Sequence, residues 1–457
     1  MALDGAPQQV DGERVRVQRG SVQAGPTPDG PAGRVRAVDA FRAAALLLVV
    51  FGHWLAFALV VEDGQLLGRN VQTLWPPGNW LTWVFQVMPV FFLVGGYGNA
   101  ASWTRRRLSV TALGWIGARV WRLLLPTCVL VAVVVATSLV LRLGGLDAHL
   151  VDLVVTQVGI PLWFLAVYVV VVPMTPGLVA AVDRWRLAVP GGLLGAAVAA
   201  DVLFVHLGVP FVGYLNYGFF WIGVYALGVC WRSGALSGRS PVPALLAVGG
   251  LAAAALLVWL GPYPVSMLAA EGEAVQNNGP PSTALIALAV AQTGLVLLLQ
   301  PWVERRCARP AVWAGVVWVN VYAMTLYLWH MVAGVAAAVL FFSLGLVDRL
   351  VPPAPEWWLW RPVWFAICIP LLVLLVMTFG RFERRVVATD PGPPTSRLRV
   401  LGVVLGVVLA ATGMVQLAVR GLGAGPAGLP AFGMLGVGAG AALLAWATGL
   451  GRHPHPQ

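Results

Sequence analysis

The feature that most constrains the fold of this chain is a series of twelve long apolar segments separated by short polar stretches. Most of them reach the ~20 residues that a helix needs to cross the hydrocarbon core of a bilayer. Hydrophobic residues make up 59% of the 457 residues and charged residues only 10%, which leaves too little polar surface for a soluble protein. The sequence therefore predicts an all-α fold, a polytopic membrane helix bundle of about 12 transmembrane helices. The predicted spans cover residues 40–61, 79–101, 120–141, 155–179, 188–207, 213–230, 242–261, 283–301, 313–342, 361–380, 400–419 and 430–450.

The distribution of arginine predicts the orientation of these spans. All 29 basic residues are Arg, and the formal net charge is +11. Most arginines form short clusters between spans, which is typical of charges that determine topology and not of a surface that binds nucleic acid. The alternate loops carry only Arg69, Arg142, Arg349, Arg361 and Arg420. Because arginine-rich loops stay in the cytoplasm, we expect a multi-pass protein of the cell membrane with a cytoplasmic N-terminus, the lipid bilayer as partner and no nucleic acid.

Composition divides the chain into five parts. Residues 1–36 are rich in Gly, Pro, Gln and Arg without an apolar period, which predicts a disordered cytoplasmic tail. Residues 37–385 hold the first ten spans. A polar cytoplasmic linker over 386–399 separates them from two Gly-rich spans within 400–450, which we interpret as an accessory pair because Gly-rich faces suit close helix packing. A short tail covers 451–457.

The cysteines give no sign of a metal site. Cys128, Cys230, Cys307 and Cys368 are isolated in or beside apolar spans, with no Cys-x-x-Cys or Cys/His spacing. Such residues usually behave as small buried hydrophobic side chains. We therefore predict neither a bound metal ion nor a disulfide framework.

The first span carries one Arg and one His within an otherwise apolar helix. Arg42 and His53 are the only strongly polar side chains between Asp39 and Glu62. Eleven residues at 100° each return to within about 20° of the starting direction, and they rise ~16 Å. The two groups therefore share one helix face, Arg42 near the cytoplasmic end and His53 deep in the membrane. Ionisable groups in a bilayer need a partner or a function; a neutral imidazole there can take a proton from a hydroxyl.

Further polar residues are candidates for the same site. Arg119 and Arg122 precede Pro126 on the third span and complete an anion site with Arg42 if the helix bends inward. The segment "NVYAMTLYLWHMV" places Tyr327 and His330 at the ninth span, where aromatic residues either form an interfacial belt or line the site. Asn277 and Asn278 precede Gly-Pro-Pro, which is turn chemistry or a sugar-facing loop. Asp201, the one acid at membrane depth, either pairs with an Arg or His or lies at a water-filled edge near His206.

Four segments in order resemble the acyltransferase 3 family of integral membrane O-acyltransferases. "VDAFRAAALLLVVFGHW", which includes Asp39, resembles the Arg-x10-His motif of the first span. "MPVFFLVGGYGNA" followed by "RVWRLLLP" resembles the aromatic-Gly second span and the Arg-x2-Arg…Pro start of the third. "PLWFLAVYVVVVPMTP", which includes Trp163, resembles the Leu-Trp-x-Leu segment, and "LYLWH" resembles the late Tyr-Leu-x-His segment. The resemblance covers roughly 37–385.

This resemblance implies transfer of an acyl group from cytoplasmic acyl-coenzyme A to a hydroxyl on an envelope glycan, a lipid or a secreted small molecule. His53 is then the general base, and Arg42, Arg119 and Arg122 hold the donor. Asp39, Trp163, Tyr327, His330, Asn277 and Asn278 are the candidate lining residues of the site. Acyl-coenzyme A is expected as co-substrate, without a permanently bound cofactor, and no oligomeric state is predicted. No Ser or Cys is placed by motif next to His53, which favours direct transfer over an acyl-enzyme.

The chain also departs from the family pattern. The stretch 167–169 is Val-Tyr-Val where many members carry an acid, and Gly95 stands where a Ser precedes the second-span Gly. Ala323 and Met324 replace a Ser-Tyr pair. The sequence leaves two other functions open: a transporter or exporter that uses Arg42, His53 and Asp201 as a proton or anion path, and a catalytically silent binding protein on the same scaffold.

Overall fold

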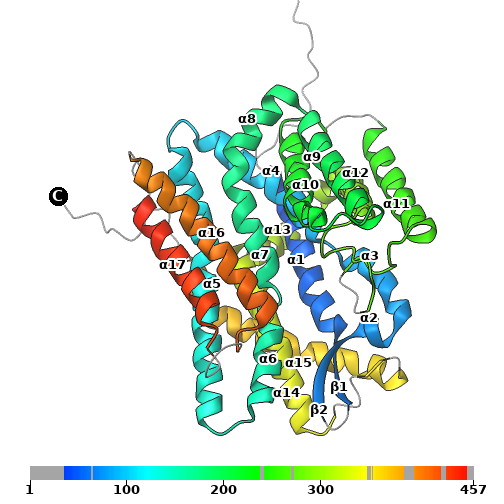
Figure 1. The fold of residues 1–457 in the computed structure, drawn as a ribbon, viewed down its shortest axis with the longest axis vertical. Coiled ribbons are helices and arrows are strands. Elements are labelled where there is room, and N and C mark those ends of the chain that lie inside the picture. Colours follow the sequence, from blue (N-terminus) through cyan, green and yellow to red (C-terminus); the bar gives the residue numbers. More distant parts are fainter. Residues whose placement is uncertain are drawn as a thin grey trace, which may run out of the picture. The chain divides into compact units, whose positions relative to one another are not determined.

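The computed structural model describes residues 35–62, 65–236, 241–268, 272–346, 351–352, 354–384, 396–423 and 429–449 (Figure 1). The tail predicted over 1–36 lies outside these residues apart from its last two. The tail over 451–457 lies outside them as well, and so do residues 386–395 of the predicted linker.

The described chain is a bundle of helices with one short antiparallel β-hairpin. Twelve of its helical stretches are long and apolar enough to cross a membrane, which confirms the predicted polytopic all-α membrane fold. The elements are α1 Arg36–Ala56, β1 Phe57–Glu62, β2 Gln65–Asn70, α2 Val71–Leu74, η1 Pro76–Leu81, α3 Thr82–Phe85, α4 Met88–Arg106, α5 Ala112–Leu143, α6 Ala148–Gly159, α7 Leu162–Val171, η2 Val172–Met174, α8 Thr175–Trp185, α9 Ala188–Val205, η3 Val212–Leu215, α10 Asn216–Arg232, α11 Val242–Leu260, α12 Thr283–Cys307, α13 Pro310–Val321, α14 Ala323–Ser343, α15 Pro355–Arg384, α16 Arg397–Arg420 and α17 Ala431–Thr448.

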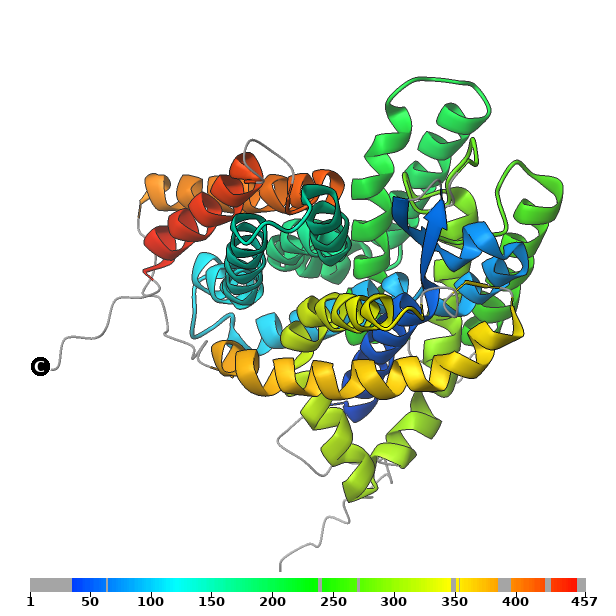
Figure 2. The same cartoon turned by 90° about the horizontal axis from the view of Figure 1, so that it is seen from below.

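The first span begins and ends earlier than the segment 40–61 predicted from the sequence. Helix α1 ends at Ala56, and the following apolar residues form β1, which pairs with β2 from Phe57 opposite Asn70 onwards. Apolar periodicity alone does not separate a buried helix from a buried strand, and the Val-rich stretch after Ala56 favours a strand. The hairpin lies at the lower end of α1 in Figure 1 and is seen from below in Figure 2. We call this end of the bundle the hairpin face and the opposite end the Arg36 face.

The segment 313–342, predicted as one span, is two helices. Helix α13 ends at Val321 and α14 begins at Ala323. The Glu383 carboxylate from α15 accepts hydrogen bonds from the backbone N–H groups of Met324 (3.0 Å) and Thr325 (3.0 Å). A carboxylate at a helix N-terminus satisfies otherwise unpaired N–H groups and interacts favourably with the helix dipole. Glu383 therefore fixes a new helix start inside the segment.

A second carboxylate starts α1 in the same manner. Glu304, near the end of α12, accepts hydrogen bonds from the backbone N–H groups of Arg36 (3.1 Å) and Ala37 (2.7 Å). The Arg36 guanidinium also donates to the backbone oxygen of Cys307 at 3.2 Å. The helices that carry His53 and His330 are thus both anchored at their N-terminal ends by acids from other helices.

Asp201 is an anchor of the same kind for α12. Its side chain is 1% exposed and accepts hydrogen bonds from the Tyr263 hydroxyl (2.6 Å) and from the backbone N–H and hydroxyl of Thr283 (2.8 and 2.7 Å). The sequence suggested an Arg or His partner for Asp201, or a position at a water-filled edge. In the structure its partners are instead Tyr263 and Thr283. Burial, reinforced by the bond to Asp201, raises the pKa of the Tyr263 phenol.

The last two spans pack on each other through glycine and lie at one edge of the bundle (Figures 1 and 2). A Cβ at Gly440 of α17 would lie 2.6 Å from the backbone N of Ala410 and 2.6 Å from the backbone O of Gly406, both in α16. The pair also contacts the rest of the bundle, since a Cβ at Gly159 of α6 would lie 2.9 Å from the backbone O of Leu417. The missing side chains let the helix backbones touch.

We expect the Gly440→Ala substitution to destabilise the protein by about 1–3 kcal/mol, because the added methyl group overlaps backbone atoms that cannot rotate away. Thermal unfolding of the detergent-solubilised protein measures this effect. Gly438 on the same helix has open space around its Cβ position, so Gly438→Ala is the matched control and does not lower the melting temperature, since Ala favours a helix more than Gly does. Equal melting temperatures for the two variants would contradict the packing described.

Candidate active site

Arg42 and His53 extend from the same helix toward different parts of the bundle. Arg42 is half-buried near the Arg36 face and forms an ion pair with Asp39, one turn earlier, at 3.6 Å. His53 is half-buried in the last turn of α1, next to the hairpin. Helix geometry separates the two positions by ~16 Å along the axis, so α1 connects the two ends of the candidate site.

The hydrogen bonding of His53 fixes its chemical character. Its Nδ1 lies 2.9 Å from the backbone oxygen of Val49, and a carbonyl accepts only from a protonated ring nitrogen. In the neutral imidazole, Nε2 then carries the lone pair. This is the tautomer that a general base needs.

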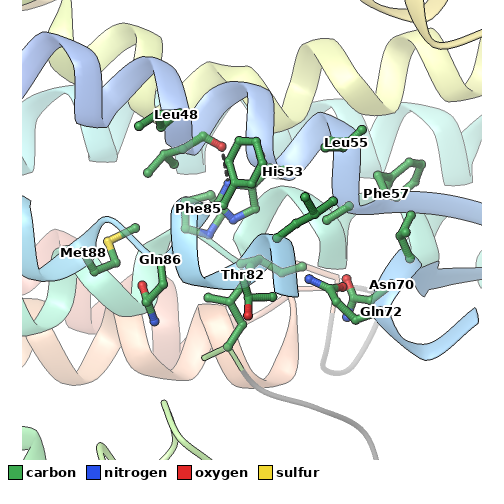
Figure 3. Close-up of a pocket in the computed structure, with 18 of the residues that line it drawn as sticks. Leu48, His53, Leu55, Phe57, Asn70, Gln72, Thr82, Phe85, Gln86 and Met88 are labelled. Carbon is green, nitrogen blue, oxygen red and sulfur yellow. Dashed lines mark hydrogen bonds between the residues drawn. The ribbon is translucent and has the colours of Figure 1, made fainter. Parts of the chain in front are cut away.

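His53 lines a cavity of about 230 Å³ at the hairpin face. In Figure 3, His53 points from α1 toward the short helical segments that carry Thr82, Phe85 and Gln86. The polar part of the lining consists mainly of side-chain amides and includes no charged side chain, and several aromatic rings line the cavity as well. The amides are Asn70, Gln72, Gln86, Gln157 and Asn278, and the rings are those of Phe57, Phe85, Trp163 and Tyr327. Such a lining offers neutral hydrogen-bond partners and apolar surface, which suits an uncharged hydroxyl-bearing group.

Three of the candidate lining residues, Trp163, Tyr327 and Asn278, meet at this cavity. The Gln86 side chain positions Asn278, because its Nε2 donates to the Asn278 side-chain oxygen at 3.3 Å. The Tyr327 hydroxyl donates to the backbone oxygen of Pro161 at 2.7 Å. Residues from five separate parts of the chain, from α1 to α14, thus converge around His53.

His330 lies directly beside His53, with 5.0 Å between the two ring centroids. It is fully buried. Its Nδ1 donates to the backbone oxygen of Tyr327 (2.6 Å), and its Nε2 has no hydrogen-bond partner among the described residues. Trp54 joins the two helices here, since its ring N–H donates to the backbone oxygen of His330 at 2.8 Å. Two imidazoles with free Nε2 lone pairs therefore occupy one buried region.

Asn277 does not reach the cavity. It is fully buried, and its amide donates to the backbone oxygens of Pro264 and Ser266, both at 2.8 Å. Its side-chain oxygen accepts from the Ser282 hydroxyl at 2.5 Å. These bonds hold the loop before α12 in shape, which agrees with the turn interpretation of this segment.

The arginines predicted to hold a donor lie together toward the Arg36 face. The Arg119 guanidinium on α5 is close enough to Arg122 and Arg42 to interact with both electrostatically. Arg119 also lies over the Trp115 ring, 5.5 Å from its centroid. Arg42 approaches α4 closely, because its Nη2 would be 3.1 Å from a Cβ at Gly98. Planar guanidinium groups gathered in this way have the charge and the geometry that phosphates bind to.

Arg361 lies at the hairpin face, although the sequence placed it in an outer loop. It instead lies in α15, is 4% exposed, and donates to the backbone oxygens of Trp54 (3.1 Å) and Phe57 (3.2 Å) at the end of α1. Its guanidinium stacks on Trp357, 4.3 Å from the ring centroid. The aromatic run "EWWLWRPVWF" is the signal that predicts a cation–π site. Arg361 thus binds one carbonyl in the last turn of α1 and one at the start of β1, and so holds the junction that follows His53.

We expect Arg361→Gln to destabilise the protein by about 2 kcal/mol or more, because it leaves buried carbonyl groups without a strong donor. The melting temperature of the purified protein measures the loss. Arg420 is exposed at the end of α16, so Arg420→Gln is a control with the same chemical change and no expected effect. A melting temperature for Arg361→Gln equal to that of the control would show that Arg361 does not hold the end of α1.

Within the described ranges, no group of three or more His, Cys, Asp or Glu side chains gathers closely enough to hold a metal ion. No curated protein and no solved structure matches the chain. A family model described as an acyltransferase domain matches residues 35–380. The match contains Arg42, His53, the arginine cluster and the whole cavity lining, and it ends before α16. This multi-pass membrane protein therefore belongs to the acyltransferase 3 family.

Proposed function

We propose that the protein is a membrane O-acyltransferase. It moves an acyl group from cytoplasmic acyl-coenzyme A to a hydroxyl of an envelope glycan, a lipid or a secreted small molecule. The observation that carries the proposal is the arrangement along α1: an arginine cluster at one end and, ~16 Å away, a histidine in an amide-lined cavity at the other. Membership of the acyltransferase 3 family supports the same reaction class.

The donor binds at the Arg36 face. Arg42, Arg119 and Arg122 hold its phosphates, since planar guanidinium groups bind phosphate oxygens through paired hydrogen bonds. The arginine-rich loops favour a cytoplasmic position for this face, in the compartment where acyl-coenzyme A is made. The thioester then extends along α1 toward His53.

The acceptor occupies the cavity at the hairpin face, in the cell membrane. Its hydroxyl donates a hydrogen bond to Nε2 of His53. As the acceptor oxygen attacks the thioester carbonyl carbon, His53 takes the hydroxyl proton; the new C–O bond forms and the C–S bond breaks. The proton on His53 then passes to the departing thiolate, which leaves as free coenzyme A. The imidazole returns to its neutral state with no net change in the protein.

The cavity lining supports direct transfer without an acyl-enzyme. Its described lining residues include neither Ser nor Cys, and besides Tyr327 the one hydroxyl is that of Thr82. The Thr82 hydroxyl donates to the backbone oxygen of Asn79 at 2.5 Å and accepts from the backbone N–H of Met267 at 2.8 Å. It is therefore engaged in holding the loop and is not free as a nucleophile.

The test supplies acetyl- and longer-chain acyl-coenzyme A, each isotopically labelled in the acyl group, to membranes that contain the protein and to membranes that lack it. We expect protein-dependent release of coenzyme A together with labelled acyl esters, identified by mass spectrometry in the lipid, glycan and soluble fractions. Proton-coupled uptake of solutes into vesicles without any acyl transfer would overturn the proposal in favour of a transporter. Binding of coenzyme A without turnover would identify a silent binding protein.

A further inference from the structure

Tyr168 stands between the arginine cluster and the cavity. It lies in α7, one and a half turns after the cavity-lining Trp163, and is half-buried. Its ring stacks on Phe164 at a centroid distance of 5.7 Å. Its hydroxyl is within electrostatic range of the guanidinium groups of Arg42 and Arg119. A phenol held beside two cations is well placed to contact what those cations bind.

Two glycines of α4 bring the phenol and one arginine to the same helix face. A Cβ at Gly95 would lie 2.6 Å from the Tyr168 hydroxyl oxygen, and a Cβ at Gly98 would lie 3.1 Å from Nη2 of Arg42. Positions three residues apart are neighbours on a helix surface, with ≈ 5–6 Å between them. The Tyr168 hydroxyl and the Arg42 guanidinium therefore lie over adjacent positions of α4, where a side chain on either glycine would displace them.

The hydrogen bonding leaves the Tyr168 O–H free to donate. The Asn99 side-chain N–H, one turn after Gly95, donates to the Tyr168 oxygen at 3.3 Å, and no described residue accepts from the Tyr168 hydroxyl. A phenol oxygen can accept and donate at once. Asn99 thus binds a lone pair of the Tyr168 oxygen, and the Tyr168 O–H bond points away from α4.

Tyr225 shows the contrast. This fully buried phenol of α10 lies 2.6 Å from the Thr175 hydroxyl. The Thr175 hydroxyl donates to the backbone oxygen of Val172 at 2.7 Å, so Tyr225 is the donor of the pair. Its O–H is therefore already used inside the protein, unlike that of Tyr168.

We propose that Tyr168 is a binding residue for the acyl donor, whose O–H donates a hydrogen bond to a phosphate oxygen that Arg42 and Arg119 hold. The proposal rests on the proposed function. Three hydrogen-bond donors converge at this point, the Tyr168 O–H and two guanidinium cations, so their common ligand is an anionic oxygen. Tyr168 thereby helps to fix the position of the donor phosphates along α1.

The test measures binding of coenzyme A and of pantetheine, its phosphate-free arm, to the purified full-length protein in detergent. We expect Tyr168→Phe to weaken binding of coenzyme A about tenfold, the effect of losing one hydrogen bond to a charged group, and to leave binding of pantetheine unchanged. Tyr214→Phe, which removes an exposed phenol of η3 outside this cluster, is the matched control and retains the wild-type affinity for both ligands.

Gly95→Ala gives a second route to the same group. Its Cβ would meet the Tyr168 hydroxyl oxygen at 2.6 Å, so we expect it to weaken coenzyme A binding in the wild type and to have a smaller effect in the Tyr168→Phe background. Equal coenzyme A affinities for a folded Tyr168→Phe and the wild type would overturn the role of Tyr168. Equal losses for coenzyme A and pantetheine would overturn the phosphate assignment. A wild-type protein that binds no coenzyme A would instead overturn the proposed function.

Discussion

His53→Asn is expected to lower the rate of acyl transfer about 100-fold or more, the usual contribution of a general base. Asparagine keeps a side-chain N–H that can donate to the backbone oxygen of Val49, as Nδ1 of His53 does at 2.9 Å, but it carries no basic lone pair. The loss therefore falls on kcat, whereas the affinity for coenzyme A, which we propose depends on arginines ~16 Å away, stays at the wild-type value. Steady-state kinetics with labelled acyl-coenzyme A, together with direct binding of coenzyme A, separate the two quantities.

The matched control is His206→Asn. His206 is exposed at the end of α9 and does not line the cavity, so the same chemical change there leaves kcat unchanged. Melting temperatures of both variants verify that they are folded. Near-normal turnover by a folded His53→Asn protein would remove His53 from the chemistry, and His330, whose ring centroid is 5.0 Å away, would be the next base to test.

Arg42→Gln is expected to weaken binding of acyl-coenzyme A by about tenfold or more and to raise its KM by a similar factor, because the proposed contact of Arg42 with phosphate is charged and bidentate. Arg42→Lys keeps the charge but not the planar fork, so its effect is intermediate. The loss shrinks as salt rises, since salt screens the interaction of the cluster with phosphate. Titration of coenzyme A at two ionic strengths measures the affinities and their salt dependence, and steady-state kinetics measure KM.

Arg105 provides the control for Arg42. It is exposed near the end of α4, toward the same face of the bundle, so Arg105→Gln changes the net charge equally without reaching the candidate site. An equal loss of coenzyme A affinity in both variants would show that the face attracts the donor only through its overall charge. An unchanged affinity in Arg42→Gln would place the donor phosphates elsewhere.

Much of the fold follows from the length of the apolar segments, and the exceptions have identifiable causes. All twelve predicted spans overlap helical stretches that are long and apolar enough to cross a membrane. The junction after Ala56 and the break before Ala323 are held by side chains distant in sequence. Arg361 binds the carbonyls of Trp54 and Phe57 where α1 meets β1, and Glu383 binds the first N–H groups of α14. A local apolar pattern contains no information about such partners.

The part of the candidate site that lies on one helix could be predicted from the sequence, and the part that depends on contacts between helices could not. The helical period alone places Arg42 and His53 on one face of α1. The contact between Gly95 and Tyr168, by contrast, joins positions on α4 and α7 that differ separately from the family pattern. In the structure the two differences explain each other, since the glycine vacates the space that the phenol fills. A single sequence shows both residues but not that they touch.

The most direct test of a donor site and an acceptor site at opposite ends of α1 uses sealed membrane vesicles of both orientations. Acyl-coenzyme A is added outside, and the release of its free thiol is measured with a thiol reagent. We expect release from inside-out vesicles, which expose the arginine cluster, and none from sealed right-side-out vesicles until they are permeabilised. The thiol release from inside-out vesicles and from permeabilised right-side-out vesicles should both disappear with His53→Asn. Equal release from the two sealed preparations, or release that survives in folded His53→Asn protein, would contradict a donor that enters at Arg42 and reacts at His53.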